Sequence, residues 1–263
     1  MWAILSVPSK KGRKWEPEAF FETGRTGIDD ILKQVAATGF ALHHGVALDF
    51  GCGLGRLTQG LAHYFEKVYG VDISPTMIAE AERYNRFGNA CTYIVNDSAD
   101  LRRFENGSFD FVYCDAVLQH IPPKASKAYI AEFVRILRPG GLLMFQVPSA
   151  LRKPFHDTTD TTPHDRPEPN ANPGVATESP AVPSNAEIAT AAAPSAAPDD
   201  LGRLVDMHLI PREEILNLLG TAGATLVLVQ EEDWAGPEWV NFRYWVTKPA
   251  VAQSQPSEHS RVA

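Results

Sequence analysis

The apolar positions of this chain follow two recurring patterns. Short runs rich in Val, Ile, Leu and Phe, typical of buried strands, alternate with longer stretches in which apolar residues recur every three or four positions, typical of helices. The short runs predict strands at residues 45–50, 67–72, 91–97, 108–114, 142–147, 225–230 and 239–247. The longer stretches predict helices at residues 27–39, 55–65, 74–88, 129–141 and 211–223.

This alternation predicts the fold class. Strands separated by helices form a parallel sheet that is covered on both faces, so we expect one doubly wound α/β domain with a mostly parallel, seven-stranded sheet. No helical pattern separates the last two strands, and they are therefore expected to pair as an antiparallel hairpin at one edge. Ser74-Pro75 is a typical helix start, and Pro139-Gly140-Gly141 is expected to end the helix at 129–141.

One segment does not follow either pattern. Residues 151–200 hold nine of the twenty prolines, many alanines and a single aromatic side chain, Phe155. Such a composition buries too little apolar surface to offset the entropy of ordering, so we expect a disordered Pro/Ala-rich insert. The resulting division is an N-terminal helical cap segment, a core, the insert, a segment that completes the same domain, and a disordered tail. These parts are 1–44, 45–150, 151–200, 201–248 and 249–263.

Charge and cysteine content narrow the class of protein. The formal net charge is −8, which disfavours a nucleic-acid or anionic-membrane partner because phosphate binding depends on Lys and Arg. The three cysteines form no CxxC pair and no spacing typical of a metal site, so no metal is expected and the thiols are expected to be reduced. The N-terminus lacks the features of a secretory signal and no apolar stretch has the length of a membrane span. We therefore expect a cytoplasmic protein with no membrane partner.

A glycine-rich turn follows the first predicted strand. Gly51, Gly53 and Gly55 stand at the carboxyl end of that strand, where open α/β sheets bind ligands and where glycine lets a ligand approach the backbone closely. The dinucleotide fingerprint GxGxxG requires a glycine where this chain has Arg56, which disfavours an NAD(P) site. Asp72 ends the second strand about twenty residues downstream, where a carboxylate can accept hydrogen bonds from both hydroxyls of a ribose.

Five stretches carry a resemblance to a known family. The stretches "LDFGCGLGRLT", "GVDISPTMI", "NDSADL", "FDFVYCDAVLQHI" and "LRPGGLLMF", in this order and spacing, resemble the successive motifs of class I S-adenosylmethionine-dependent methyltransferases of the small-molecule type. The resemblance is close over residues 45–147, and a trailing helix and two strands extend it to about 248. It implies a Rossmann-like fold and S-adenosylmethionine as cofactor.

The resemblance also implies roles for individual residues. Asp49 and the backbone at Gly51 and Gly53 would lie along the methionine part of the cofactor. Asp72 would hold the ribose and Ile73 would pack on the adenine. At the ends of the next two strands, Asp97 would accept from the adenine amino group with Ser98 supplying an amide, while Cys114 and Asp115 would approach the methionine amino end and the methyl group.

The acceptor side is less well defined by the sequence. His120, just beyond the fourth strand, is the best-placed candidate for a general base, with Gln119 beside it as a polar contact and His208 as a second candidate. Six aromatic side chains could wall an apolar acceptor pocket or could simply pack in the core; these are Trp15, Phe20, Phe21, Trp234, Trp239 and Trp245. The insert follows the fifth strand on the ligand side, so a lid role is open.

The expected activity is therefore methyl transfer to a small-molecule oxygen or nitrogen. Enzymes of this fold that methylate nucleic-acid amino groups place Asn or Asp, two prolines and an aromatic residue after the fourth strand, and this chain has "DAVL" there. Two alternatives stay open: a non-catalytic S-adenosylmethionine-binding regulatory or assembly protein, and an NAD(P)-dependent oxidoreductase. The acceptor, the methylated atom and the oligomeric state are not indicated by the sequence.

Overall fold

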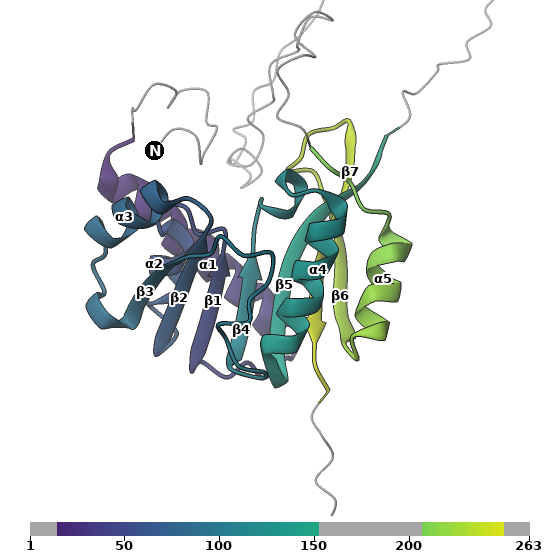
Figure 1. Ribbon diagram of the computed structural model, residues 1–263, viewed down its shortest axis with the longest axis horizontal. Coiled ribbons are helices and arrows are strands. Elements are labelled where there is room, and N and C mark those ends of the chain that lie inside the picture. The colour runs from purple at the N-terminus through teal and green to yellow at the C-terminus, as the bar shows by residue number, and fades with distance from the viewer. Residues whose placement is uncertain (1–14, 153–206, 250–263) are drawn as a thin grey trace, which may run out of the picture.

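The structure, a computed structural model, describes residues 15–152 and 207–249. Seven strands form one sheet in the order β3-β2-β1-β4-β5-β7-β6 (Figure 1). Their bounds are β1 Val46–Phe50, β2 Lys67–Asp72, β3 Cys91–Val95, β4 Phe109–Cys114, β5 Leu137–Leu151, β6 Thr225–Glu232 and β7 Trp239–Thr247. Strand β7 runs in the opposite direction to the other six strands, and it pairs with both β5 and β6. The predicted doubly wound α/β fold and its edge hairpin are confirmed.

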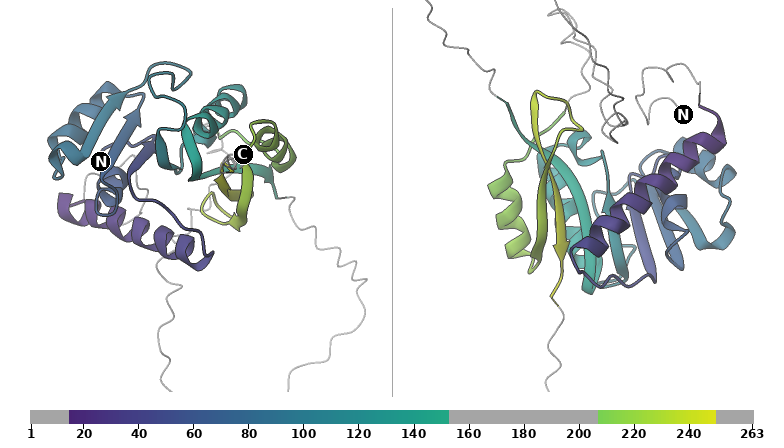
Figure 2. Two further views of the ribbon diagram at one scale, coloured as in Figure 1. Left: turned by 90° about the horizontal axis from the view of Figure 1, so that it is seen from below. Right: turned by 180° about the vertical axis from the view of Figure 1, so that it is seen from behind.

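Helices cover both faces of this sheet, as the two turned views show (Figure 2). The α-helices are α1 Pro17–Ala37, α2 Arg56–Leu61, α3 Pro75–Arg83, α4 Pro123–Ile136 and α5 Arg212–Thr221, with short 3₁₀ turns η2 Gly88–Ala90 and η3 Leu118–His120. Helices α4 and α5 cover one face with a core that includes Phe133, Phe145 and Tyr244. Helix α1 crosses the other face over a second core around Phe111, Met144 and Trp245. The two cores fix the sheet from both sides.

Helix α1 is longer than the sequence pattern predicts. The predicted helix covers residues 27–39, whereas α1 begins ten residues earlier and passes through Gly24 and Gly27 without a break. A Cβ on Gly24 would lie 2.1 Å from the carbonyl oxygen of Arg56, and a Cβ on Gly60 would lie 2.6 Å from the carbonyl oxygen of Gly24. These glycines therefore let α1 and α2 approach closely, and Gly24 does not end a helix.

The expectation that Pro139-Gly140-Gly141 ends a helix is wrong. Helix α4 ends at Ile136, and β5 begins at Leu137 and runs through the Pro-Gly-Gly stretch. The pairing of β5 with β4 shifts register there, and Gly140 has a φ of 77°, so these residues form an irregularity at the start of a strand. Helix α4 also begins six residues before the predicted start. Helices α2 and α3 end earlier than predicted, at Leu61 and Arg83.

The chain leaves the sheet and returns to it at the same end, where the parallel strands finish. Strand β5 ends at Leu151, and the next described segment returns beside the ends of β4 and β5, where the backbone N–H of His208 donates to the carbonyl of Gln119 (2.7 Å) and that of Ile210 to Pro148 (2.9 Å). Nearly all of the predicted insert 151–200, and the tail 249–263 after its first residue, lie outside the described residues. None of the described helices is long and apolar enough to span a membrane.

Candidate functional site

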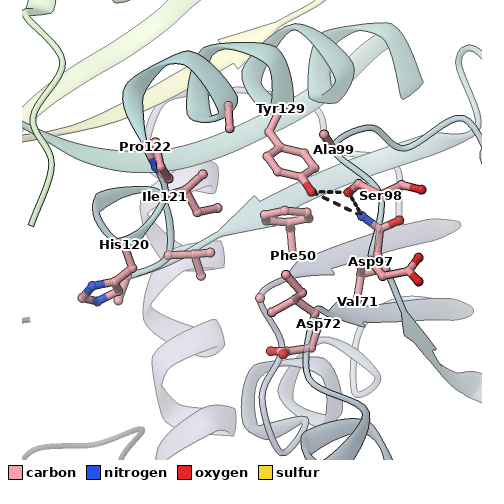
Figure 3. Close-up of a pocket in the computed structure, with 16 residues that line it drawn as sticks. Phe50, Val71, Asp72, Asp97, Ser98, Ala99, His120, Ile121, Pro122 and Tyr129 are labelled. Atoms are coloured by element: carbon pink, nitrogen blue, oxygen red, sulfur yellow. Dashed lines mark hydrogen bonds between the residues drawn. The ribbon is translucent and has the colours of Figure 1, made fainter. Parts of the chain in front are cut away.

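A cavity of about 520 Å³ opens at the carboxyl ends of the parallel strands. Its walls come from the ends of β1, β2, β3 and β4, from η3, and from the first two turns of α4 (Figure 3). Six of the residues proposed from the sequence line it, namely Gly51, Asp72, Ile73, Asp97, Ser98 and His120. The topology therefore brings together side chains that lie up to about seventy residues apart in the chain.

The glycine-rich turn is held by its own hydrogen bonds. The N–H groups of Gly51 and Cys52 donate to the carbonyl of Val71, that of Gly53 donates to the Asp72 carboxylate (2.9 Å), and that of Gly55 donates to Cys52. A phosphate-binding turn keeps such N–H groups free for its anion. Since all four donors have partners in the protein, this turn is poorly suited to a pyrophosphate.

Gly51 also has a steric reason to be glycine. Its φ is 79°, and a Cβ on it would lie 2.2 Å from a methyl carbon of Val117, which lines the cavity. Val117 follows Ala116, whose φ of 57° is the single positive value among the described non-glycine residues. Because a left-handed conformation is unfavourable for alanine, the chain after β4 is held in a strained bend that brings Val117 against the turn.

Asp72 and Ile73 form the central part of the cavity wall. The two carboxylate oxygens of Asp72 accept from the N–H groups of Gly53 and Ser74, at 2.9 and 2.8 Å. A carboxylate has about four acceptor positions, so each oxygen can accept one further hydrogen bond. Ile73 is 75% exposed and lines the same cavity. An exposed apolar side chain next to a half-exposed carboxylate suits a ligand with a flat apolar ring and a pair of hydroxyls.

The end of β3 is fixed by a polar anchor beneath the cavity. The buried Asn96 amide donates to the carbonyls of Ser98 and Asp100, and the Tyr129 hydroxyl on α4 donates to the carbonyl of Ser98 (2.6 Å). Asp97 and Ser98 are exposed, and Figure 3 shows the Asp97 carboxylate away from these bonds. The anchor therefore uses the backbone and leaves the Asp97 carboxylate available to a ligand.

Asp49 lies behind the turn and not in the cavity wall. It is buried at the end of β1, and its carboxylate accepts from the Thr58 hydroxyl (2.6 Å). Burial raises the pKa of Asp49 to about 6, although the Thr58 hydrogen bond and the nearby Arg56 lower it. A positively charged group at this end of the turn would stabilise the ionised carboxylate.

Two further predicted residues stand at the end of β4 but do not line the cavity. Cys114 is buried in the core between the sheet and α4, and burial raises the pKa of its thiol well above the ordinary value. Asp115 is half-buried and forms an ion pair with Arg243 of β7 at 3.5 Å. Gly53 and Gly55 also do not line the cavity; they support the turn behind it.

The aromatic side chains weighed as an acceptor wall divide into two groups. Phe20, Phe21 and Trp245 are buried and pack in apolar clusters, so core packing accounts for them. Trp15 packs against the cluster of Phe20 and Phe21. Trp234 and Trp239 flank the turn of the C-terminal hairpin, where Trp234 is 38% exposed. None of the six lines the cavity.

His120 lies on the opposite side of Phe50 and Tyr129 from Asp97 (Figure 3). Burial of the ring, and then the neighbouring His208, lower its pKa, so the imidazole is neutral at neutral pH. The Gln119 amide nitrogen lies 3.3 Å from His120 Nε2. The structure thus places all three polar residues expected on the acceptor side next to one another.

Sequence reasoning missed the apolar part of the wall. Phe50, Val117, Ile121, Pro122, Ala125 and Tyr129 line the cavity as well. Pro122 and Ala125 belong to the start of α4, where the two prolines interrupt the helical pattern, so that the sequence predicts this helix only from Tyr129. Within the described residues no group of three His, Cys, Asp or Glu side chains is arranged to hold a metal ion.

Comparisons with known proteins agree with this geometry. Residues 48–145 match the family described as a methyltransferase domain. Over 143 residues the chain is 31% identical to the ubiquinone biosynthesis O-methyltransferase of Methylococcus capsulatus, which covers 54% of this chain and 59% of that protein. The chain spans about half the length of the curated relatives it matches.

Solved structures share the fold at low sequence identity. Magnesium protoporphyrin IX methyltransferase from Synechocystis PCC 6803, determined with bound S-adenosylmethionine, has a TM-score of 0.51 at 19% identity, covering 90% of this chain and 86% of that one. The [4+2]-cyclase SpnF has a TM-score of 0.55 at 15% identity, covering 86% and 82%. At such identities the likeness concerns the fold alone.

Proposed function

We propose that this chain, whose residues 48–145 match a methyltransferase-domain family, is a class I methyltransferase that transfers a methyl group from S-adenosylmethionine to an oxygen or nitrogen atom of a small molecule. The observation that carries the proposal is the cavity wall at the end of β2, where the Asp72 carboxylate and the exposed Ile73 lie together beside a glycine turn whose N–H groups are already bonded. The same turn argues against an NAD(P)-dependent oxidoreductase, because the N–H groups of Gly51, Cys52, Gly53 and Gly55 are already bonded within the protein.

The residues present fit this cofactor. Asp72 would accept from the two ribose hydroxyls, Ile73 would pack on the adenine ring, and Asp97 would accept from the adenine amino group. Asp49, buried behind the turn, would face the positively charged methionine amino group. When bound, S-adenosylmethionine supplies a methyl group activated by a positively charged sulfur.

The protein's own contribution would be alignment, exclusion of water and proton removal. Tyr129, Ile121 and Pro122 give the cavity an apolar wall on the α4 side, which favours close packing of an organic acceptor. His120 is neutral and would accept the proton that a hydroxyl or amine acceptor loses, after its Nε2 exchanges the long contact to Gln119 for one to the acceptor. The bacterial O-methyltransferase relative supports an oxygen acceptor as the first class to screen.

Calorimetric titration with S-adenosylhomocysteine tests the proposal. We expect micromolar binding by the unaltered chain and no comparable binding of NADH. Asp72→Ala should weaken binding at least tenfold, but it also removes the acceptors of two backbone N–H groups. Ile73→Asp avoids this difficulty, because Ile73 is 75% exposed and contributes little to folding.

Leu151→Asp is the matched control, since Leu151 is a second exposed apolar residue (58%) and does not line the cavity. Loss of binding in Ile73→Asp but not in Leu151→Asp supports the assignment. Binding of NADH in place of S-adenosylhomocysteine would contradict it. Tight binding with no turnover against pooled small metabolites would favour the non-catalytic binding protein instead.

A further inference from the structure

A cluster of polar side chains continues from the cavity toward the C-terminal hairpin. Asp115 directly precedes Ala116 and Val117 of the cavity wall, and its carboxylate lies 3.5 Å from the Arg243 guanidinium on β7. The same guanidinium lies 3.1 Å from the carboxylate of Glu232, the last residue of β6, and 3.2 Å from the amide oxygen of Gln146 on β5. We call these four residues and Gln230 the hairpin cluster.

The sheet topology places the hairpin cluster at the ligand edge. Strands β4, β5 and β6 run in the same direction, so Asp115, which follows β4, and Glu232, which ends β6, lie toward the same end of the sheet. Because β7 is antiparallel, its first residues lie at that end of the sheet, and Arg243 in its middle reaches Asp115 and Glu232. Gln146, Arg243 and Gln230 are directly opposite one another across β5, β7 and β6, and therefore share one face of the sheet.

The charges and bonds of this cluster are not balanced within the protein. The side chains of Asp115, Glu232 and Arg243 are only 22, 22 and 14% exposed, and they carry two negative charges against one positive charge. One oxygen of Glu232 and the amide oxygen of Gln230 are buried without a hydrogen-bond partner in the described part of the chain. Both open atoms accept hydrogen bonds and neither can donate, so the cluster lacks donors.

Burial also raises the pKa of Glu232, and the neighbouring Asp115 raises it further although Arg243 lowers it. A ligand that donates hydrogen bonds would relieve both the unpaired oxygens and the excess negative charge. A carboxylate or phosphate ligand would instead bring further acceptor oxygens and further negative charge.

We propose that the hairpin cluster is the acceptor-recognition surface of the methyl-transfer site, and that it selects acceptors whose group facing the hairpin is a hydrogen-bond donor, a hydroxyl or an amine, over anionic ones. This inference rests on the proposed function, since it takes the methyl group to lie near Asp115. Asp115, Arg243 and Glu232 then act in specificity, and His120 faces the acceptor from the α4 side.

The test uses the full chain saturated with S-adenosylhomocysteine and ligand-observed NMR. The probes are small aromatic and aliphatic scaffolds, each supplied as the alcohol, the amine, the carboxylate and the phosphate. We expect alcohols and amines to bind and their anionic counterparts to bind at least tenfold more weakly. Glu232→Gln and Asp115→Asn should each reduce the preference at least fivefold, mainly by admitting carboxylates.

Glu231→Gln is the matched control. Glu231 neighbours Glu232 on the same strand but is exposed on the opposite face, where it pairs with Arg152 at 2.6 Å, so its removal makes the same change in net charge without touching the cluster. The proposal is overturned if anions bind as well as alcohols and amines, if Glu232→Gln behaves as Glu231→Gln does, or if no probe binds.

The two proposals fail in different ways. Failure of the unaltered chain to bind S-adenosylhomocysteine refutes the proposed function. Intact binding of S-adenosylhomocysteine, with no preference among the probes, refutes only the role of the cluster. Unchanged binding of S-adenosylhomocysteine by Glu232→Gln, and an unchanged circular dichroism spectrum of Asp115→Asn, show that the two variants remain folded.

Discussion

Some residues at this site line the cavity, whereas others, such as Asp49, lie behind it. Its carboxylate contributes no surface to the cavity; it lies beneath the turn, bonded to Thr58 and removed from water. Keeping an ionised carboxylate there is unfavourable, so the folded protein retains a proton on Asp49 at pH values where the unfolded chain has already lost it.

The sign of the resulting pH dependence follows from the two pKa values. The pKa is about 6 in the folded protein and 3.8 in a free side chain, so the folded state binds the extra proton between those values. The contribution of Asp49 to the free energy of unfolding is therefore greatest below pH 4, falls as the pH rises toward 6, and is constant above it. The loss is on the order of 3 kcal/mol, at 1.36 kcal/mol per pKa unit.

Urea unfolding of the unaltered chain and of Asp49→Asn between pH 4 and 7 measures this contribution. Since asparagine cannot ionise, the difference between the two unfolding free energies should change by that amount in favour of Asn as the pH rises. A difference that does not change with pH would show that Asp49 does not retain the proton.

At the scale of helices and strands, close approach decides where elements begin and end. Helix α1 could approach α2 only where both helices lack a Cβ, at Gly24 and Gly60, and this contact lets α1 cross the sheet directly behind the glycine turn. The same glycines are visible in the sequence, but the pattern alone does not show whether a glycine ends a helix or allows a neighbouring helix to approach.

Two substitutions in α1 test whether Gly24 is needed for the close approach of α1 to α2. Gly24→Ala places a methyl group 2.1 Å from a backbone oxygen that cannot move independently, and should lower the free energy of unfolding by about 2 kcal/mol or more, as overpacking does. Gly27→Ala meets only a Leu57 methyl carbon at 3.9 Å and should raise it by up to about 1 kcal/mol through helix propensity. Urea unfolding distinguishes the pair, and equal effects would refute the close-contact role of Gly24.

Local sequence patterns predict some features of this structure and not others. Strand positions, the hairpin and the residues around Asp72 were predictable, because each depends on a local pattern or on motifs in a fixed order. The start of α4 at Pro123, the strand through Pro139 and the pairing of Asp115 with Arg243 were not. Each of these depends on contacts between segments that are distant in the chain, and periodicity carries no information on them.

For the whole molecule, the sheet is completed by residues that follow the insert. Strand β7 lies between β5 and β6 and buries Tyr244, Trp245 and Val246, one or more of them in each core. The first part of the chain therefore contains the cofactor residues but leaves β5 without a partner on one side. We expect the segment after the insert to be required for stability even though it supplies no residue to the wall at Asp72.

Two separately produced fragments, 1–152 and 207–263, test this expectation. Mixed together, they should assemble and bind S-adenosylhomocysteine within a few-fold of the intact chain, whereas 1–152 alone should bind it poorly and show reduced resistance to urea. Trp245→Ala in the second fragment, which removes a fully buried side chain, should weaken assembly by about 3 kcal/mol or more. Full-strength binding by 1–152 alone would contradict the dependence on β7.

The hydrogen bonds from His208 to Gln119 and from Ile210 to Pro148 have a consequence for the history of such a chain. They fix the register of everything that follows the connection, whatever its length or composition. Insertions and deletions between Arg152 and Met207 can then accumulate without shifting β6 or β7, and the His208 end of the connection stays beside Gln119 and His120. Lineages that carry this domain can therefore exchange whole modules at that position without any redesign of the sheet.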